Sequence, residues 1–441
     1  MGLNPAWNGD VPTHHNQYEL MAQSLIQGHL YLDLPVDPVL AQLNNPYDPV
    51  ARNDSGASFF WDHAFYDGRY YMYFGIVPVL VLFLPYQLIT GHSLTTYHAT
   101  QLFVALFIVG LFSLFWRMRK IYFKQMPFVS FLILCVAFSL MSVWYGVGSP
   151  ALYCTAISSA LCSEVWSLYL FAQAMGMEFG SRLDIRRRIF LVLASLLGAM
   201  AFGCRPPIAL ANLVVIPLLV SLFRMRDTRN FIIDATAIIA PYVIVGALLM
   251  GYNFLRFESP FEFGQSYQLT VADQSGYGEG GRSFSSSLQE FSKFFFELPG
   301  ESTTFAGVFI NYPMLFISFF SLAYPRVRVM LRERRLLTYL FTMIVAIILI
   351  GLFDSVWSPY ILERYRMDVY WLLGIISFVL YGFWGESVKN QVFYVALSVL
   401  GVITAVTSVL LFLVPYDSNL ASLYPDSAKT LRQYISLGIW K

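Results

Sequence analysis

Three acidic residues near the start of the chain have the chemistry of a general base: Asp10, Glu19 and Asp62. A carboxylate in a polar loop can accept the proton of an attacking hydroxyl group, provided that the base is positioned beside it. For each acid, the alternative is an ordinary loop carboxylate that only contacts water. The three together form the predicted set of catalytic residues.

Arginines at the ends of apolar segments are candidates for binding a phosphate group. Arg205 lies between two proline-flanked apolar blocks, Arg256 lies where another block ends, and Arg364 is followed by Tyr365 at the start of a third. A charge in such a place is costly unless it is paired or hydrated, and a guanidinium can bind two phosphate oxygens at once. Glu164, in the middle of an apolar block, joins this predicted substrate-binding set for the same reason.

Each of these residues also has a structural interpretation. Arg256 would be an interfacial anchor whose charged end reaches water, and Glu164 would hydrogen-bond to a neighbouring helix. Arg364 would pair with Glu363 or Asp368 and stabilise the start of a helix. The sequence does not decide between the two interpretations for Arg256 and Glu164. Around Arg364 there are more charged groups than capping requires, which favours binding.

The composition is that of a membrane protein. The chain is 57% hydrophobic and 12% charged, with a mean hydropathy of +0.58, and its net charge of +1 argues against a nucleic-acid partner. The apolar residues form blocks long enough to cross a bilayer as helices. These blocks are 74–91, 98–116, 126–147, 150–177, 189–204, 207–223, 231–252, 305–323, 336–353, 367–384 and 391–414. We therefore expect an all-α polytopic membrane protein with about nine to eleven transmembrane helices.

Lysine and arginine predict the orientation. More than half of the 28 basic residues fall in four short linkers, which marks these linkers as cytoplasmic. The expected organisation is an extracytoplasmic loop with a juxtamembrane helix, a first transmembrane module, a second extracytoplasmic loop with a surface helix, further transmembrane helices and an extracytoplasmic tail. Their ranges are 1–73, 74–252, 253–304, 305–414 and 415–441.

The acid-rich segment 1–73 conflicts with a simple count of crossings, which would place it inside. Either block 74–91 does not fully cross, with Pro78 and Pro85 bending it, or one pair of spans between 98 and 223 is miscounted. If 1–73 lies outside, the helix that would carry it across is not in this sequence.

The order of the polar elements resembles the C-type glycosyltransferase superfamily. A surface helix ends at Gly28, a proline-rich loop follows, and an aromatic segment containing Tyr-Phe-Gly-x-x-Pro at 73–78 leads to an apolar block ending near Thr90-Gly91. An Arg-Pro pair at 205–206 lies between two later blocks, and Arg364-Tyr365 also resembles the superfamily.

This resemblance implies a polytopic enzyme that takes a sugar from a polyprenyl-phosphate or related lipid carrier and transfers it outside the cytoplasm. In the family, an acidic motif in the first exported loop supplies the base and often a metal ligand. Here His14 and His15 stand in that place, and they are predicted to bind substrate. All six histidines lie in the first 98 residues, and His with Asp or Glu suits a divalent ion. Spacing alone does not identify the cofactor, so a divalent metal ion stays an open candidate.

The predicted function is a glycosyltransferase of the cell envelope in a bacterial inner membrane, with a lipid-linked sugar donor and membrane lipids as partners. A polysaccharide polymerase or ligase and a lipid-linked-sugar transporter are the alternatives, and a non-enzymatic assembly protein is a third. Few ionisable groups lie inside the apolar blocks and no repeat is visible, which disfavours a transporter. The sequence does not determine the donor sugar, the acceptor or the oligomeric state.

Overall fold

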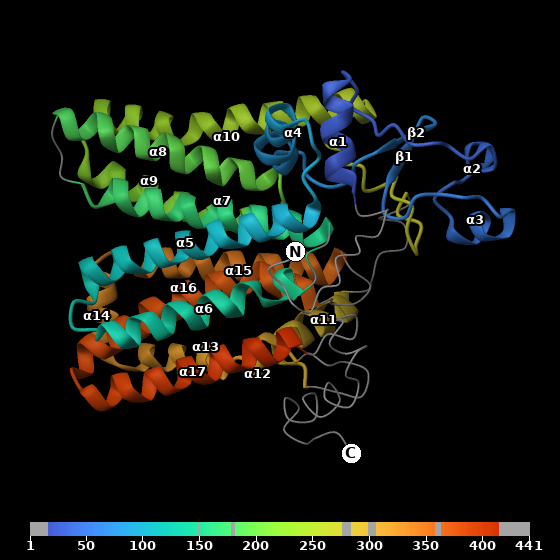
Figure 1. Cartoon of the computed structure of the whole chain (residues 1–441). Helices are drawn as coiled ribbons and strands as arrows, with labels where there is room; N and C mark the ends of the chain where they lie inside the picture. Colours follow the sequence, from blue (N-terminus) through green and yellow to red (C-terminus); the bar gives the residue numbers. More distant parts are fainter. Residues whose placement is uncertain are drawn as a thin grey trace, which may run out of the picture.

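The chain is an all-α polytopic membrane protein. The computed structural model describes residues 16–148, 150, 152–177, 181–275, 284–298, 306–357 and 363–413. Long helices run side by side through the molecule, and the described residues contain one two-stranded sheet (Figure 1). The composition predicted this class correctly.

Eight helices of the described part are long and apolar enough to cross a membrane. They are α5 (Thr96–Tyr122), α6 (Phe128–Gly148), α7 (Leu152–Met175), the continuous pair η3 (Ile208–Val214) and α9 (Val215–Met225), α10 (Thr228–Phe257), α15 (Leu337–Trp357), α16 (Glu363–Val388) and α17 (Gln391–Leu413). A ninth is added if a pair bent by 89° counts as one span. This pair consists of α13 (Pro313–Phe319) with η4 (Phe320–Ala323), followed by α14 (Pro325–Glu333).

Helix α8 (Ser181–Phe202) lies alongside α7 and α10 (Figure 1). Its first turns carry Asp184 and the three arginines 186–188, so only the stretch 189–202 is apolar. It packs closely with η3 across the break at 203–207, so blocks 189–204 and 207–223 form two neighbouring helices.

Block 74–91, expected as a span, is too short to cross. It folds into η2 (Val79–Phe83), a π-helical turn, and α4 (Leu84–Thr90), and together they form one short apolar helix over Val79–Thr90. Pro85 lies where the π-helical turn passes into α4, and it has no N–H to donate to the preceding turn. A helix of this length falls well below the about 20 residues that a bilayer requires. This observation supports the first explanation of the crossing conflict.

Helix α16 lies at the centre of the bundle. Its apolar stretch is almost entirely buried, whereas α10 and α17 leave most of theirs exposed on the outside. Phe115 of α5 stacks on Phe378 of α16 with ring centroids 4.1 Å apart. The first turn of α16 carries Glu363, Arg364 and Arg366, so the most enclosed helix also positions a charged cluster.

The basic and the polar segments lie at opposite ends of the bundle. Arg119 and Lys120 lie in the last turn of α5, and Arg224 lies in the last turn of α9. Helix α14, with five exposed arginines in and after it, lies at the same end (Figure 1). The opposite end carries α1 (Gln17–Ile26), α2 (Pro38–Gln42), α3 (Pro49–Ser55), β1 (Ala64–Tyr66) and β2 (Arg69–Tyr71).

The two expected surface helices are present. In α1, the predicted apolar stripe is buried, with Tyr18 and Met21 fully enclosed against η2 and α4. In α11 (Phe284–Phe296), Phe294 and Phe295 are buried, and the helix packs on α15 and on α12 (Val308–Asn311). Both helices therefore rest on the protein itself.

Candidate functional site

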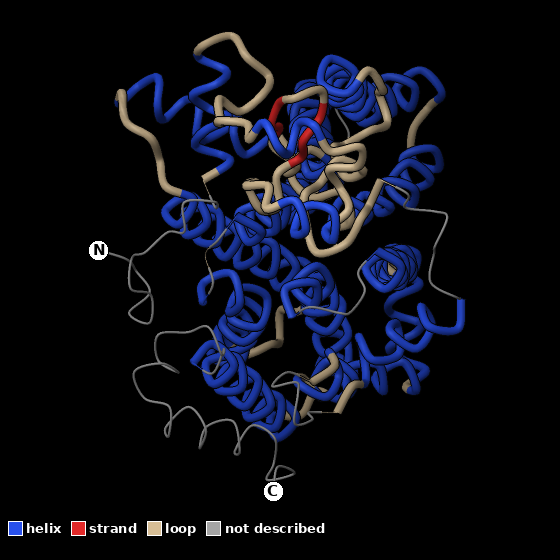
Figure 2. The backbone as a smooth tube through the Cα atoms, turned by 90° about the vertical axis from the view of Figure 1, so that its right-hand side faces the viewer, coloured by secondary structure: helices blue, strands red, loops and turns tan. Residues whose placement is uncertain are grey.

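The segment around Asp62 and residues 262–270 form one unit. The backbone amides of Asp62 and Phe65 donate to the carbonyls of Leu269 and Tyr267 at 3.0 and 2.9 Å. Strands β1 and β2 form an antiparallel hairpin on this unit. Seen from the polar end, the strands and loops cover the ends of the helices beneath them (Figure 2). Two polar segments about 200 residues apart in the sequence thus meet over the same end of the bundle.

Polar side chains add further links between the two segments. Asn45 Nδ2 donates to Asp273 Oδ2 at 2.7 Å, and the Arg52 guanidinium donates to the Thr270 carbonyl. Arg52 is 1% exposed, so this bond is well protected from water. These links hold the first segment in a fixed position relative to the second.

The motif Tyr-Phe-Gly-x-x-Pro packs directly on the Arg-Pro break. The amide of Val77 donates to the Gly203 carbonyl at 2.9 Å. A Cβ atom at Gly75 would overlap the backbone of Gly203 and Cys204. Glycine is therefore required at 75 by this close backbone approach, and the contact places Arg205 beside the end of the first polar segment.

Asp62 is buried, with 7% of its surface exposed. Its Oδ1 accepts from Gln268 Nε2 at 3.0 Å. Burial raises the pKa of the Asp62 carboxyl above its usual range, while the charge of Arg364 and hydrogen bonds from the side chains of Thr270, Trp61 and Gln268 act in the opposite direction. A carboxylate in this setting is a better proton acceptor than a solvated one.

Arg364 lies between two tyrosine rings. Its Cζ is 3.9 Å from the ring centroid of Tyr153 and 5.4 Å from that of Tyr365. Within the part of the chain that the structure describes, no carboxylate comes within 4.0 Å of its guanidinium. The aromatic faces stabilise the cation and leave its N–H groups available for an anion.

Arg205 is ion-paired with Asp368 of α16. Asp368 Oδ2 is 2.7 Å from both Nε and Nη2 of Arg205, and the Asp368 side chain is fully buried. The Cζ of Arg205 lies 5.4 Å from the Tyr365 ring. Arg205 and Arg364 therefore lie on the same tyrosine, and Asp368 fixes one of them in position.

Tyr73 lies within electrostatic range of the other members of the cluster, which are Tyr365, Arg205, Asp62 and Arg364. Burial is the main reason that the pKa of Tyr73 lies above its ordinary value, with a smaller contribution from Tyr365. Four of the predicted site residues thus converge around Tyr73: one acid, two arginines and one tyrosine.

The sequence analysis missed three residues of this site: Tyr73, Tyr153 and Asp354. Asp354 is 2% exposed, its Oδ2 has no hydrogen-bond partner among the described residues, and it lies within electrostatic range of Arg205 and Asp368. An acid at the end of an apolar block, as in Phe-Asp-Ser-Val-Trp, is a signal that could have found it.

Glu19 and Arg256 occupy structural positions. Glu19 Oε1 accepts from both the amide and the hydroxyl of Thr96, at 2.6 and 2.7 Å, and so caps the start of α5. Arg256 Nη1 donates to the Met72 carbonyl and Nη2 to Asn253 Oδ1, both at 2.8 Å. Arg256 is 5% exposed, so it is neither a surface anchor nor directed into the cluster. Catalysis by Glu19 and substrate binding by Arg256 stay predictions, and these contacts favour the structural alternatives.

Glu164 lies within the bundle in a hydrogen-bonded network. Its Oε1 accepts from Asn212 Nδ2 at 2.5 Å, and Asn212 Oδ1 in turn accepts from the Tyr242 hydroxyl at 2.5 Å. The network joins α7, η3 and α10. This matches the structural alternative for Glu164, whose substrate-binding role stays a prediction.

Asp10, His14 and His15 lie outside the described residues. Within residues 16–413, apart from the gaps given above, no group of three or more His, Cys, Asp or Glu side chains is placed to hold a metal ion. The cofactor therefore stays undetermined.

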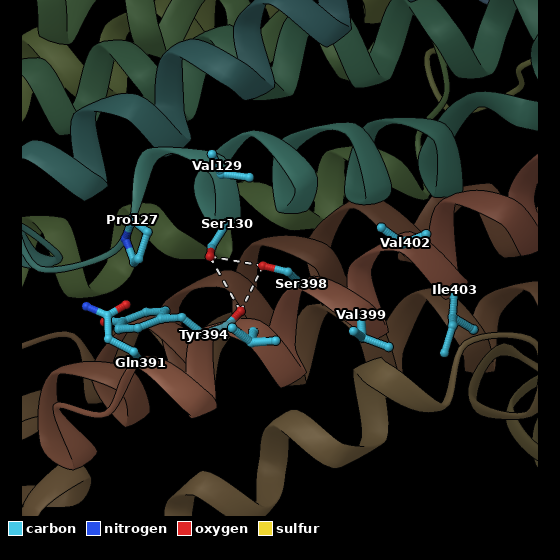
Figure 3. A pocket seen from close by; sticks show the side chains of 10 residues that line it. Pro127, Val129, Ser130, Gln391, Tyr394, Ser398, Val399, Val402 and Ile403 are labelled. Atoms are coloured by element: carbon cyan, nitrogen blue, oxygen red, sulfur yellow. Dashed lines mark hydrogen bonds between the residues drawn. The ribbon is translucent and has the colours of Figure 1, made fainter.

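A groove of about 500 Å³ lies between α6 and α17, away from this cluster (Figure 3). Its wall is mainly aliphatic, and Ser130, Gln391, Tyr394 and Ser398 are its polar residues. The Ser398 hydroxyl lies within hydrogen-bonding distance of Ser130 Oγ and of the Tyr394 carbonyl, at 2.9 and 2.8 Å. It contains no charged side chain. Lipid chains suit such a surface, and it offers no group that could act on a sugar or a phosphate.

No protein-family model matches the sequence, and no curated protein matches it. Among solved structures, the chain is similar to an oligosaccharyltransferase from Archaeoglobus fulgidus in the apo form, with a TM-score of 0.50 and 12% identity, over 99% of this chain and 54% of that chain. It is also similar to ArnT from Cupriavidus metallidurans bound to undecaprenyl phosphate, with a TM-score of 0.43 and 14% identity, over 97% of this chain and 71% of that chain.

The present chain spans about half the length of the oligosaccharyltransferase. At these identities the similarity concerns the fold. The resemblance predicted from the order of the polar elements is confirmed at that level, because the chain has a fold similar to that of the archaeal oligosaccharyltransferase.

Proposed function

We propose that this protein is a membrane glycosyltransferase, which transfers a sugar from a polyprenyl-phosphate-type carrier to a cell-envelope acceptor. One observation carries the proposal: a buried acid, Asp62, lies within electrostatic range of an arginine, Arg364, that has no ion-pair partner among the described residues. These are the two kinds of group that the reaction needs, an acceptor for a proton and a cation for a phosphate. The fold supports this class by analogy.

The phosphate of the carrier would bind to Arg364, with Arg205 as a second cation. A guanidinium can hold two phosphate oxygens through parallel hydrogen bonds. Asp368 already takes two donors of Arg205, so Arg364 makes the larger contribution. Both guanidinium groups lie 5.4 Å from the centroid of the Tyr365 ring.

In the transfer step, an acceptor hydroxyl oxygen forms a bond to the anomeric carbon of the donor sugar. The bond from that carbon to the phosphate oxygen breaks, and the electron pair leaves with the phosphate. The hydroxyl proton moves to the Asp62 carboxylate, and the new negative charge on the phosphate is stabilised by Arg364. No other described residue is assigned a proton transfer.

The site would face the extracytoplasmic side of a bacterial inner membrane. The basic helix ends and α14 lie at the opposite end of the bundle, and basic residues collect on the cytoplasmic side. Residues 16–73 and 253–275 lie together at the other end, which supports two extracytoplasmic segments over one site.

The test measures binding and transfer separately. Purified protein in detergent is mixed with undecaprenyl phosphate, and bound lipid is counted by native mass spectrometry. Arg364→Ala is expected to weaken binding, since it removes the unpaired cation. Arg332→Ala is the matched control, because Arg332 is an exposed arginine at the opposite end.

Transfer is then followed in membranes, from a labelled sugar on the polyprenyl carrier to envelope material. Asp62→Asn is expected to abolish transfer while keeping the lipid bound, because the amide cannot accept the proton. If both Arg364→Ala and Asp62→Asn transfer sugar at the wild-type rate, the proposal is wrong. Movement of the intact glycolipid without sugar transfer would instead support a transporter.

A further inference from the structure

The residue before Asp62 presents an exposed aromatic face. Trp61 is 38% exposed, although Asp62 and His63 on its carboxyl side are buried. Its ring centroid lies 6.5 Å from that of Phe59. An exposed indole beside a buried acid is unusual for a packing residue, because packing alone would enclose the ring.

The backbone holds Trp61 in place. Asp62 adopts a left-handed conformation, with φ of 54°, and this turn leaves Trp61 exposed while Asp62 points into the protein. The Trp61 carbonyl lies 2.8 Å from His63 Nδ1, and the Asp62 carbonyl accepts from Gln17 Nε2 at 2.8 Å. The ring is therefore carried by a rigid turn, as a substrate platform requires.

The side chain of Trp61 also influences the proposed base. Together with those of Thr270 and Gln268, it acts to lower the pKa of the Asp62 carboxyl, against the effect of burial. Trp61 therefore lies near Asp62, which is in turn within electrostatic range of Arg364.

We propose that Trp61 is the platform on which a sugar ring stacks during transfer. The C–H groups on one face of a sugar carry partial positive charge, and they are attracted to the negative face of an indole ring. A sugar on Trp61 would lie next to the proton acceptor Asp62 and within reach of a phosphate on Arg364. This inference rests on the proposed function and names the residue that recognises the sugar.

Four variants at this position separate stacking from simple burial. Trp61→Phe and Trp61→Tyr keep a flat aromatic face, whereas Trp61→Leu keeps apolar bulk without it and Trp61→Ala removes both. Stacking predicts that Phe and Tyr retain most of the affinity and that Leu and Ala lose it about fivefold to tenfold. A lipid-anchoring role for Trp61 predicts instead that Leu behaves like Phe. Trp116→Ala is the matched control, since Trp116 is 37% exposed on α5 near its basic end.

The probes distinguish the two sugars that Trp61 could bind. Affinity is measured for undecaprenyl phosphate with and without its sugar, and KM is measured for donor and acceptor separately. A loss confined to the glycosylated carrier identifies the donor sugar, and a rise confined to the acceptor KM identifies the acceptor sugar. Either result supports the proposal that a sugar ring stacks on Trp61.

Equal weakening for the bare and the glycosylated carrier would overturn the inference, and so would wild-type constants in Trp61→Ala. Both results leave the proposed function intact as long as the wild-type protein transfers sugar. Failure of the wild-type protein to bind or transfer any lipid-linked sugar would instead reject the proposed function. The folding of each variant is checked by its thermal melting temperature and elution volume.

Discussion

The ion pair between Arg205 and Asp368 is expected to hold the start of α16 against the break between α8 and η3. Asp368 is fully buried and Arg205 is 17% exposed, with a shortest N–O distance of 2.7 Å. Removing one partner of a buried pair leaves an uncompensated charge, at a cost of about 3–5 kcal/mol. Asp354 also lies within electrostatic range of Arg205, so we expect Asp368→Asn to fall at the lower end of this range.

The assay is thermal unfolding of the purified protein in detergent, read by fluorescence. Asp368→Asn should lower the melting temperature clearly. Glu290→Gln is the control, because it breaks the partly exposed pair between Glu290 and Lys293, which is worth at most about 1 kcal/mol. The double variant Arg205→Met with Asp368→Leu should recover stability, since apolar side chains can replace a buried pair, and it should still lack full transfer activity. If Asp368→Asn has the same melting temperature as the wild-type protein, the ion pair does not hold α16 in position and this reasoning is wrong.

Four further outcomes follow from the structure. Glu19→Ala should lower stability by about 1 kcal/mol through loss of the cap on α5, with kcat unchanged; a large fall in kcat at wild-type stability would make Glu19 catalytic. Asn212→Leu should cost about 1–3 kcal/mol, because it leaves the buried Glu164 carboxyl without its donor, and unfolding in detergent measures this cost. Transfer should decline as the pH falls through the raised pKa of Asp62, since only the ionised carboxylate accepts a proton. Arg364→Met removes a positive charge and so raises the pKa of Asp62 further. The residual activity of this variant should therefore begin to fall at a higher pH than that of the wild-type protein. An unchanged pH profile would show that Arg364 does not act on Asp62.

The helical class and the surface helices followed from the sequence because they depend on local patterns. The stripe of Tyr18 and Met21 predicts a helix with one buried face, and α1 has this face. The length of a helix was harder to predict from apolar composition alone. Block 74–91 has the composition of a span, but its helix covers only Val79–Thr90 and is too short to cross a bilayer.

The site was predicted in part. Arg364 stood out because a charged group is costly at the mouth of a span. That it lies within electrostatic range of Asp62 depends on a fold that brings together residues about 300 positions apart, which no local pattern contains. The capping role of Glu19 depends in the same way on Thr96, which lies 77 residues further along the chain. Tyr73 and Tyr153 were missed because tyrosine is common at membrane interfaces, so its type alone carries little information.

The most direct test of the account joins the two polar segments covalently. Asp273 is exposed and Asn45 is half-buried, and their side chains are hydrogen-bonded at 2.7 Å. Three of the four native cysteines are buried. In membranes treated with an oxidant or a short bifunctional maleimide, Asn45→Cys with Asp273→Cys should cross-link within one chain, and Asn45→Cys with Arg332→Cys should not. If the first pair stays unlinked while both thiols react with an added reagent, the two segments do not meet over one face, and the site built on Asp62 and Arg364 would not exist.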